Sequence, residues 1–316
     1  MVDICTGSSG FIGSHLVKAL EKPFIRCDIK DGSGDIRKPL EFPSNIDTIY
    51  HLAALADIVP SIENPRDYFE TNVTGTLNIL EAARKAGCKK FIYAASASCY
   101  GDNPNHIYTA ADDGRFLGVQ PTNEHRDCDP AYPYALTKHL GEQLVMHWSN
   151  VYKIPAISLR LFNVYGLRQR TTGAYGAMFG TFLAQKANGK PMTIVGDGTQ
   201  QRDFVHVSDV VDAFIKAANS DCQGIYNVGT GNPQSVNYIA KLIGGETVHI
   251  PKRPGEPDIT CADISKIRED LGWEPKVSIE AGVRELVEHL RDYSDAPVWT
   301  EEGIKSATKK WFEALS

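Results

Sequence analysis

The sequence lacks the features that mark several classes of protein. Its 316 residues contain 33 lysines and arginines against 39 acids, a net charge of −6, with no long basic run. Nucleic acid is therefore not expected as a partner. No apolar run reaches the roughly 18 residues that a membrane span needs, and no signal-peptide pattern opens the chain. We expect a soluble, cytoplasmic protein with no membrane partner and a small-molecule ligand.

The seven cysteines do not form any pattern that indicates a disulfide framework or a metal site. They are odd in number, scattered, and never spaced CxxC. Such spacing indicates neither a disulfide framework nor a zinc site. We therefore expect a reducing compartment, no metal, and a packing role for Cys99, which lies three residues after Ser96.

Strands and helices alternate along the first half of the chain. The length of 316 residues predicts about two domains. Apolar periodicity predicts strands over 2–6, 24–28, 48–52, 90–95 and 156–162, and helices over 11–21, 72–86, 133–151, 176–188, 209–218, 279–290 and 304–315. Such alternation predicts an α/β fold, a doubly wound parallel sheet covered on both faces. Pro and Gly become more frequent after residue 188, which indicates a smaller, loop-rich second domain.

A glycine-rich loop joins the first strand to the first helix. Gly7, Gly10 and Gly13 form GxxGxxG, a pattern that lets the chain turn sharply, approach a pyrophosphate and aim a helix N-terminus at its charge. On pattern alone, the alternative is a glycine-rich turn that binds nothing. Asp28, however, ends the next strand, where a carboxylate accepts hydrogen bonds from the adenosine ribose and repels a 2′-phosphate. Together these residues favour NAD over NADP.

A second group of residues suggests proton transfer. Tyr134 and Lys138 lie four residues apart at the start of a predicted helix, so the phenol and the ammonium share one face. Tyrosine ionises near pH 10 and is a poor base without a nearby cation. Alone, the pair would more often be a helix-start tyrosine and a solvated lysine. Ser96 favours the catalytic interpretation, because ligands of doubly wound sheets bind beyond the carboxyl ends of the strands.

Further motifs are spread over nearly the whole chain. They are TGSSGFIGSH (6–15), HLAA (51–54), NVTGT (72–76), AASASCYG (94–101), YPYALTK (132–138), LRLFNVYG (159–166), GDGTQQRDFVHVSDV (196–210), YNVGTG (226–231) and RPGE (253–256). In this order the chain resembles an extended short-chain dehydrogenase/reductase of the nucleotide-sugar epimerase and dehydratase type. The resemblance implies a Rossmann NAD-binding domain over 1–165, with 201–220 returning to it, and an interwoven nucleotide-sugar-binding domain over 166–316.

The resemblance also implies site residues. Ser96, Tyr134 and Lys138 form the catalytic triad. NAD is bound by Tyr134 and Lys138 together with Gly7, Gly10, Phe11, Ile12, Gly13, Asp28, Asp35, Ile36, Leu52, Ala53, Ala54 and Asn72. The UDP-sugar is bound by Ser96, Ser98, Tyr134, Asn163, Arg202, Arg253, Glu256 and Thr260. Asn163, Arg202 and Arg253 would hold the diphosphate and Glu256 a ribose hydroxyl; the alternative is a strand-end asparagine and two surface arginines.

The residues after Ser96 distinguish among related reactions. Dehydratases of this type carry an Asp-Glu pair where this chain has Ala97 and Ser98, and the decarboxylases keep a Glu at the position of Ser98. The resemblance therefore favours a 4-epimerase working through a transient 4-keto sugar. Thr260 is small at a position that borders the C2 substituent, so UDP-GlcNAc/UDP-GalNAc is expected alongside or in preference to UDP-glucose/UDP-galactose.

Alternatives remain open at this point. They are another NAD-dependent nucleotide-sugar epimerase, a 4-keto reductase, and a non-catalytic NAD-binding sensor. The long segment 102–120 is either a surface insertion or a substrate lid. A homodimer is expected from the resemblance, through a four-helix bundle built by the helices predicted over 72–86 and 133–151.

Overall fold

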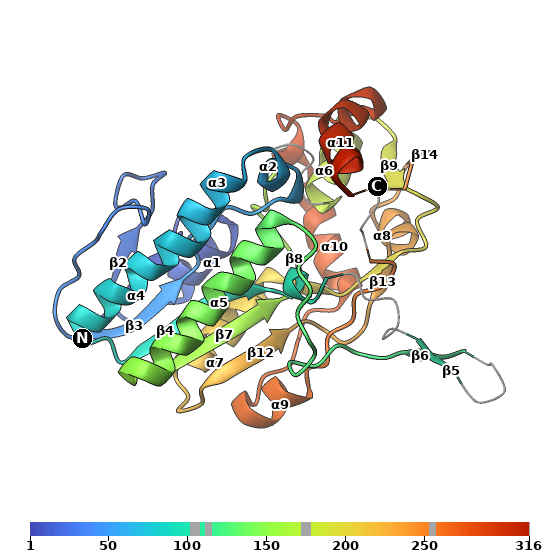
Figure 1. Ribbon diagram of the computed structural model, residues 1–316. Helices are drawn as coiled ribbons and strands as arrows, with labels where there is room; N and C mark the ends of the chain where they lie inside the picture. Colours follow the sequence, from blue (N-terminus) through green and yellow to red (C-terminus); the bar gives the residue numbers. More distant parts are fainter. Residues whose placement is uncertain (102–107, 111–115, 172–177, 253–256, 316) are drawn as a thin grey trace.

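The computed structural model describes residues 1–101, 108–110, 116–171, 178–252 and 257–315 (Figure 1). At its centre is a six-stranded parallel sheet in the order β12-β7-β4-β3-β1-β2. The strands are β1 (Val2–Thr6), β2 (Phe24–Cys27), β3 (Ile46–His51), β4 (Lys90–Ser96), β7 (Ala156–Leu161) and β12 (Gly224–Val228). The predicted doubly wound α/β fold is therefore confirmed.

Helices cover both faces of this sheet because its strands are apolar on both sides. On one face, α1 (Phe11–Ala19) and α7 (Val207–Ala218) pack with Leu16 and Phe214 against Ile92. On the other, α4 (Gly75–Ala86) and α5 (Pro133–Tyr152) pack with Ile79 and Val145 against Phe91. Figure 1 shows α4 and α5 side by side across the sheet.

Two helices, those predicted over 72–86 and 11–21, differ from the prediction at one end each. Helix α4 is preceded by α2 (Ile58–Glu63), α3 (Pro65–Tyr68) and a π-helical turn over Phe69–Thr74, so Asn72 lies in the wider turn and not in the α-helix. The helix does end where expected, because Gly87 adopts a left-handed conformation with φ of 67°. The first helix stops at Ala19, two residues earlier than predicted, since Leu20 is already extended.

The second half of the chain is built from short strand pairs. β8 (Asn163–Tyr165) pairs with β11 (Phe204–His206), β9 (Met192–Val195) with β14 (Thr247–Ile250), and β10 (Gln201–Arg202) with β13 (Gln234–Ser235). The accompanying helices are α6 (Met178–Ala187), α8 (Val236–Ile243), α9 (Ser265–Leu271), α10 (Ile279–Glu288) and α11 (Glu301–Leu315), with a 3₁₀ turn over Leu290–Tyr293. A separate apolar core joins α6, α8 and α10 through Phe182, Ile239 and Leu286, whereas Ile267 of α9 packs in the core of the central sheet.

The chain crosses between its two halves more than once. Helix α7 returns to pack on α1, and β12, a strand that the sequence did not predict, adds to the edge of the central sheet beside β7. The domain boundaries themselves stay a prediction. In segment 102–120, the structure describes β5 (Tyr108–Ala110) and β6 (Phe116–Val119), which pair antiparallel and extend away from the body of the molecule (Figure 1). Across the part of the chain that is described, no helix is both long and apolar enough to cross a bilayer.

Candidate active site

The glycine loop brings three backbone segments into direct contact at the carboxyl end of β1. Gly7 has φ of 69°, and a Cβ there would lie 2.7 Å from the Ala53 nitrogen. A Cβ on Gly13 would collide with the carbonyl oxygen of Gly7, and the Gly10 N–H donates to that same oxygen at 3.0 Å. Only glycine fits at these close approaches. The loop therefore presents backbone rather than side chains at the start of α1.

The N-terminus of α1 and Asp28 face this loop. Gly10 caps the helix without any side-chain acceptor, so the N–H groups of the first turn are left for an external anion. Asp28 is buried at the end of β2, and its carboxylate accepts hydrogen bonds from the Ser9 N–H at 2.7 Å and the Lys30 N–H at 2.8 Å. A carboxylate fixed beside a bare helix N-terminus fits a dinucleotide with free ribose hydroxyls.

The short path from Asp28 to Ile36 folds back onto α4. The Gly34 N–H donates to the Asp28 carbonyl at 3.3 Å, and Asp35 pairs with Arg37 at 2.8 Å, a contact that lowers the pKa of the Asp35 carboxyl. Ile36 is buried against Gly75, where a Cβ would lie 2.7 Å from its side chain. The predicted NAD-binding residues Asp35 and Ile36 thus lie on a loop held against α4.

A buried chain of hydrogen bonds connects β1 to the π-helical turn. Thr6 Oγ1 accepts from the N–H groups of Leu52 and Ala53 at 3.2 and 3.1 Å, so its proton points to His51 Nδ1 at 2.7 Å. His51 Nε2 then donates to Thr76 Oγ1 at 3.0 Å. Burial lowers the pKa of His51 to about 3, which keeps the imidazole neutral and this proton order fixed. His51 lies within the HLAA motif, but the sequence alone indicates no role for it.

Asn72 completes this chain and reaches the catalytic helix. Its carbonyl oxygen accepts from Thr76 at 2.7 Å, and its side chain bonds both the N–H and the C=O of Leu55, at 2.8 and 2.9 Å. Its amide also donates to Thr137 at 3.0 Å, and Thr137 donates to the Tyr134 carbonyl at 3.0 Å. Asn72 therefore fixes the segment after Leu52, Ala53 and Ala54 against the first turn of α5.

The structure brings Ser96, Ser98 and Tyr134 together. Ser96 ends β4, and its hydroxyl lies 2.8 Å from the Ser98 hydroxyl. The Ser96 side chain also hydrogen-bonds the Tyr134 phenol and lowers its pKa, against the larger effect of burial, which raises it. The phenol packs edge-on to Tyr68, with ring centroids 6.4 Å apart. A hydroxyl pair at the end of a central strand is well placed to move a proton.

Lys138 lies one turn further along α5 and is almost fully buried. Its Nζ is 4.3 Å from the centroid of the Tyr93 ring. Burial lowers the pKa of Lys138 to about 7, with Glu142 opposing that shift. Helix α5 approaches the sheet this closely because Gly141 faces the Tyr93 hydroxyl, where a Cβ would collide. Lys138 thus lies one turn from Tyr134 on α5 and packs against β4 through the Tyr93 ring.

Three other predicted substrate residues lie around Asp203. Asn163, which is exposed at the start of β8, donates its backbone N–H to the Asp203 carbonyl at 3.0 Å. Thr260 accepts from the Asp203 N–H at 3.2 Å, and Arg202 precedes this residue on β10. The structure therefore brings Asn163, Arg202 and Thr260 together. Arg253 and Glu256 lie outside the described residues.

Asp203 organises this half of the site, and sequence analysis missed it. Its buried carboxylate accepts hydrogen bonds from the N–H groups of Thr230, Gly231 and Ala262 at 2.6, 2.9 and 2.9 Å. Three loops that are distant in sequence thereby meet beside Arg202. The Asp follows Arg in the QQRDF stretch, but its partners lie 27 to 59 residues further on.

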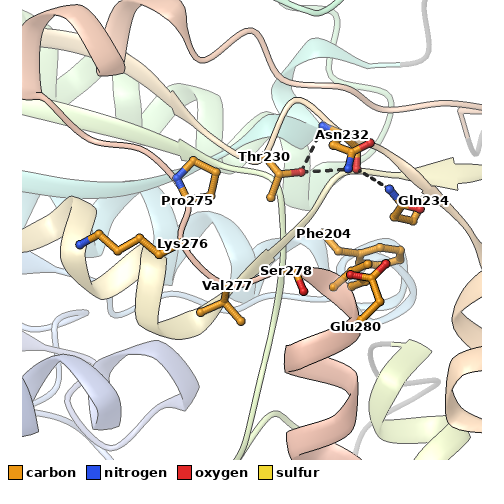
Figure 2. A pocket seen from close by; sticks show the side chains of 10 residues that line it. Phe204, Thr230, Asn232, Gln234, Pro275, Lys276, Val277, Ser278 and Glu280 are labelled. Carbon is orange, nitrogen blue, oxygen red and sulfur yellow. Dashed lines mark hydrogen bonds between the residues drawn. The ribbon is translucent and has the colours of Figure 1, made fainter.

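A hollow of about 290 Å³ lies on this half of the molecule, near the start of α10 (Figure 2). Figure 2 shows that Thr230, Asn232 and Gln234 border it on one side and Lys276, Val277, Ser278 and Glu280 on the other. None of the predicted catalytic, cofactor or substrate residues lines it. We therefore place the candidate active site at the strand ends and not in this hollow.

The fold and the strand-end site define a dinucleotide-binding enzyme. The chain belongs to the NAD dependent epimerase/dehydratase family, whose model matches residues 4–229. It is similar to a UDP-glucose 4-epimerase of Thermotoga maritima, solved with UDP-glucose, at 32% identity and a TM-score of 0.80, covering 92% of this chain and 99% of that one.

Two further relatives show the range of the family. A UDP-N-acetylglucosamine 4-epimerase from Methanobrevibacter ruminantium, solved with UDP-N-acetylmuramic acid, is 28% identical with a TM-score of 0.78, over 90% of this chain and 96% of that one. A UDP-N-acetyl-α-D-glucosaminuronate decarboxylase from Bacillus cytotoxicus is 30% identical over 92% of this chain and 97% of its own. The predicted family is confirmed, and with it NAD as the family's cofactor. The roles of individual site residues stay predictions.

Proposed function

We propose that the protein is an NAD-dependent UDP-sugar 4-epimerase that interconverts UDP-GlcNAc and UDP-GalNAc, UDP-glucose and UDP-galactose, or both pairs. The observation that carries the proposal is the cluster of Ser96 and Tyr134 at the carboxyl end of β4, with buried Lys138 one turn further along α5. Ala97 and Ser98 follow Ser96 where an acid would be needed to eliminate water or carbon dioxide. This cluster is sufficient for an oxidation and reduction at one carbon.

The chain's own groups would move the proton. Tyr134 removes the proton of the sugar C4 hydroxyl, and the Ser96 hydroxyl, already hydrogen-bonded to the phenol, supports the proton path. Lys138 in its cationic form favours the phenolate. When bound, NAD supplies reversible hydride chemistry at C4. The resulting 4-keto sugar rotates in the site, and Tyr134 returns the proton to the inverted product.

The same residues would hold the cofactor. The Gly7, Gly10 and Gly13 backbone and the N-terminus of α1 take the pyrophosphate, and Asp28 takes the adenosine ribose hydroxyls. Phe11, Ile12, Asp35, Ile36, Leu52, Ala53, Ala54 and Asn72 would line the remaining contacts, with Tyr134 and Lys138 at the nicotinamide ribose. Because the cofactor is regenerated in each cycle, we expect it to stay bound through purification.

The substrate would lie across Arg202. Its guanidinium is suited to the diphosphate, which Asn163 and Arg253 would share, while Glu256 would take a ribose hydroxyl. Thr260 would border the C2 substituent of the sugar and leave room for an N-acetyl group. We propose the corresponding division into an NAD-binding part over 1–165 with 201–220, and a substrate-binding part over 166–316.

One experiment tests the activity directly. Purified protein is incubated in turn with UDP-glucose, UDP-galactose, UDP-GlcNAc and UDP-GalNAc, and inversion at C4 is followed by NMR. We expect inversion without added cofactor and NAD released on denaturation. Turnover only with added NAD(P)H would instead identify a reductase. Loss of the carboxylate from a UDP-glucuronate control would identify a decarboxylase like the Bacillus cytotoxicus relative, and inactivity over all sugars would favour a sensor.

We also propose a cytoplasmic homodimer formed through α4 and α5. Within one chain these helices are joined by a hydrogen bond from Trp148 to Glu81 at 2.9 Å and by Arg84 lying over the Tyr152 ring at 5.1 Å. Val151 and Tyr152 at the end of α5 are exposed, as is Phe69 before α4. Two copies meeting there would complete a four-helix bundle. The molar mass from light scattering tests this.

A further inference from the structure

Three side chains that bind soft metals meet next to the catalytic residues. Cys99 lies in the 3₁₀ turn Ala97–Tyr100 that directly follows Ser96, and His139 is the residue after Lys138 on α5. Cys128 comes from the loop before α5. The two thiol sulfurs and one imidazole nitrogen all lie within 4.8 Å of one another. Two sulfurs and one nitrogen drawn from separate parts of the chain form a possible ligand set.

The spacing suits a tetrahedral ion. With Zn–S near 2.3 Å and Zn–N near 2.0 Å, tetrahedral ligand atoms stand about 3.3 to 3.8 Å apart. Side chains within 4.8 Å reach this arrangement by small torsional adjustments. The sulfurs of Cys99 and Cys128 lie within this distance of each other and of the imidazole nitrogen, so the three ligand atoms border the same space.

One ligand atom of this cluster lacks a hydrogen-bond partner in the surrounding protein. His139 Nδ1 is buried and has no hydrogen-bond partner, which is costly for a ring nitrogen. Glu142, 3.9 Å from Nδ1, is taken by Arg160 at 2.6 Å and by Ser158 at 2.8 Å.

Charge balance favours a divalent cation. Glu142 and Arg160 cancel each other, and Zn²⁺ with two thiolates and a neutral imidazole carries no net charge, so it can be buried without a large penalty. Cys128 is only partly buried, which gives an ion a route in. Thiolates select zinc-like ions over Mg²⁺ or Ca²⁺.

We propose that Cys99, Cys128 and His139 form a binding site for a zinc-class ion, with the fourth position left for water. The ion would join the turn that follows Ser96 to the helix that carries Tyr134 and Lys138, and so stabilise their relative position. The absence of CxxC spacing concealed this set, because its ligands come from three separate segments. The inference does not depend on the proposed 4-epimerase activity.

Cadmium and cobalt titrations of the reduced protein, retaining its bound NAD, test the site. We expect one Cd²⁺ per chain with a thiolate charge-transfer band in the ultraviolet, tetrahedral Co²⁺ bands in the visible, and displacement of Co²⁺ by Zn²⁺. Cys99→Ser and Cys128→Ser should each remove about half of the cadmium band, and His139→Asn should weaken binding by roughly tenfold or more. Cys222→Ser, at a partly buried cysteine outside the cluster, is the matched control and should bind like wild type.

Thermal unfolding gives a second measurement and identifies variants that fail to fold. Zn²⁺ should raise the melting temperature of wild type and of Cys222→Ser but not of His139→Asn. Of the three cluster variants, His139→Asn is the one most expected to fold, because the His139 side chain is partly exposed. A cadmium band of undiminished intensity in Cys128→Ser would overturn the proposal. Reduced protein that binds no metal would also overturn the proposal. If hydrogen peroxide then readily joined Cys99 and Cys128 in a disulfide, the two cysteines would be a redox pair and not a metal site.

Discussion

The two halves of the candidate active site are held together in different ways. Around the cofactor region, which is the glycine loop, Asp28 and the chain from Thr6 to Asn72, backbone segments touch and the linking side chains are buried. Around the substrate region, which is Asn163, Arg202 and Thr260, strands of two or three residues carry side chains that are partly or fully exposed. The first region depends on backbone geometry and the second on side-chain identity.

This difference matches what each region would have to recognise. A cofactor that is the same in every cycle can be bound by backbone N–H groups, whose positions depend on the path of the chain. Substrates that differ in one ring substituent are distinguished by side chains, which can be exchanged without rebuilding the sheet. Substitutions in each region, and at the boundary between them, test whether the two regions differ in this way.

The largest expected effect is at Tyr134, on the boundary between the regions. Tyr134→Phe keeps the ring against Tyr68 but removes its hydroxyl group. Turnover should therefore fall by about 10²- to 10⁴-fold with little change in stability. Steady-state kinetics with UDP-glucose and UDP-GlcNAc measure this. Tyr132→Phe is the matched control, since Tyr132 stacks on Tyr134 with centroids 6.4 Å apart. Equal losses in both variants would contradict a special role for Tyr134.

A pair of glycines tests whether the cofactor region has any free space. Gly7 and Gly32 have nearly the same φ, 69° and 75°, but a Cβ on Gly7 would meet the Ala53 backbone, whereas a Cβ on Gly32 has nothing within 4 Å. Gly32→Ala should cost about 1–2 kcal/mol, the conformational term alone. Gly7→Ala should cost roughly 2–5 kcal/mol and release bound NAD, since the clash adds to that term. Urea unfolding and the NAD content of purified protein distinguish them; similar values would show that the loop can relax.

The cofactor region was also the more predictable of the two. Its requirements leave local signals in sequence: glycines at close approaches, an acid at a strand end, and a tyrosine and lysine one turn apart. The same analysis missed Asp203, His51 and strand β12, because their partners lie far along the chain and a single sequence does not show pairing. It missed the π-helical turn at Asn72 because tertiary hydrogen bonds to Leu55 and Thr137, not local propensity, hold that turn.

Thr260 tests whether the substrate region tolerates change. Thr260→Tyr removes one hydrogen bond from the Asp203 N–H, so stability should fall by about 1 kcal/mol or less. Activity on UDP-GlcNAc should fall at least about tenfold while activity on UDP-glucose is little altered, because the larger side chain takes the space of the N-acetyl group. Thr260→Ser keeps the acceptor oxygen and should behave as wild type. Equal losses on both sugars would show that Thr260 does not select the C2 substituent.

The last expected effect is a pH dependence of the folding stability that originates at Lys138. Burial lowers its pKa to about 7, whereas an unfolded lysine titrates near 10.4. Between these values the unfolded chain holds a proton that the folded chain lacks, so raising the pH stabilises the folded state.

Urea unfolding at pH 7, 8 and 9 measures this contribution. The free energy of unfolding of wild type should rise relative to Lys138→Met, with a slope approaching ~1.4 kcal/mol per pH unit. Lys241→Met, which removes an exposed charge on α8, is the control for the loss of one lysine. A difference between wild type and Lys138→Met that stays constant or shrinks as the pH rises would mean that Lys138 remains charged in the folded protein. The phenolate of Tyr134 would then have a permanent cation beside it, and the cofactor region would supply both charge and geometry.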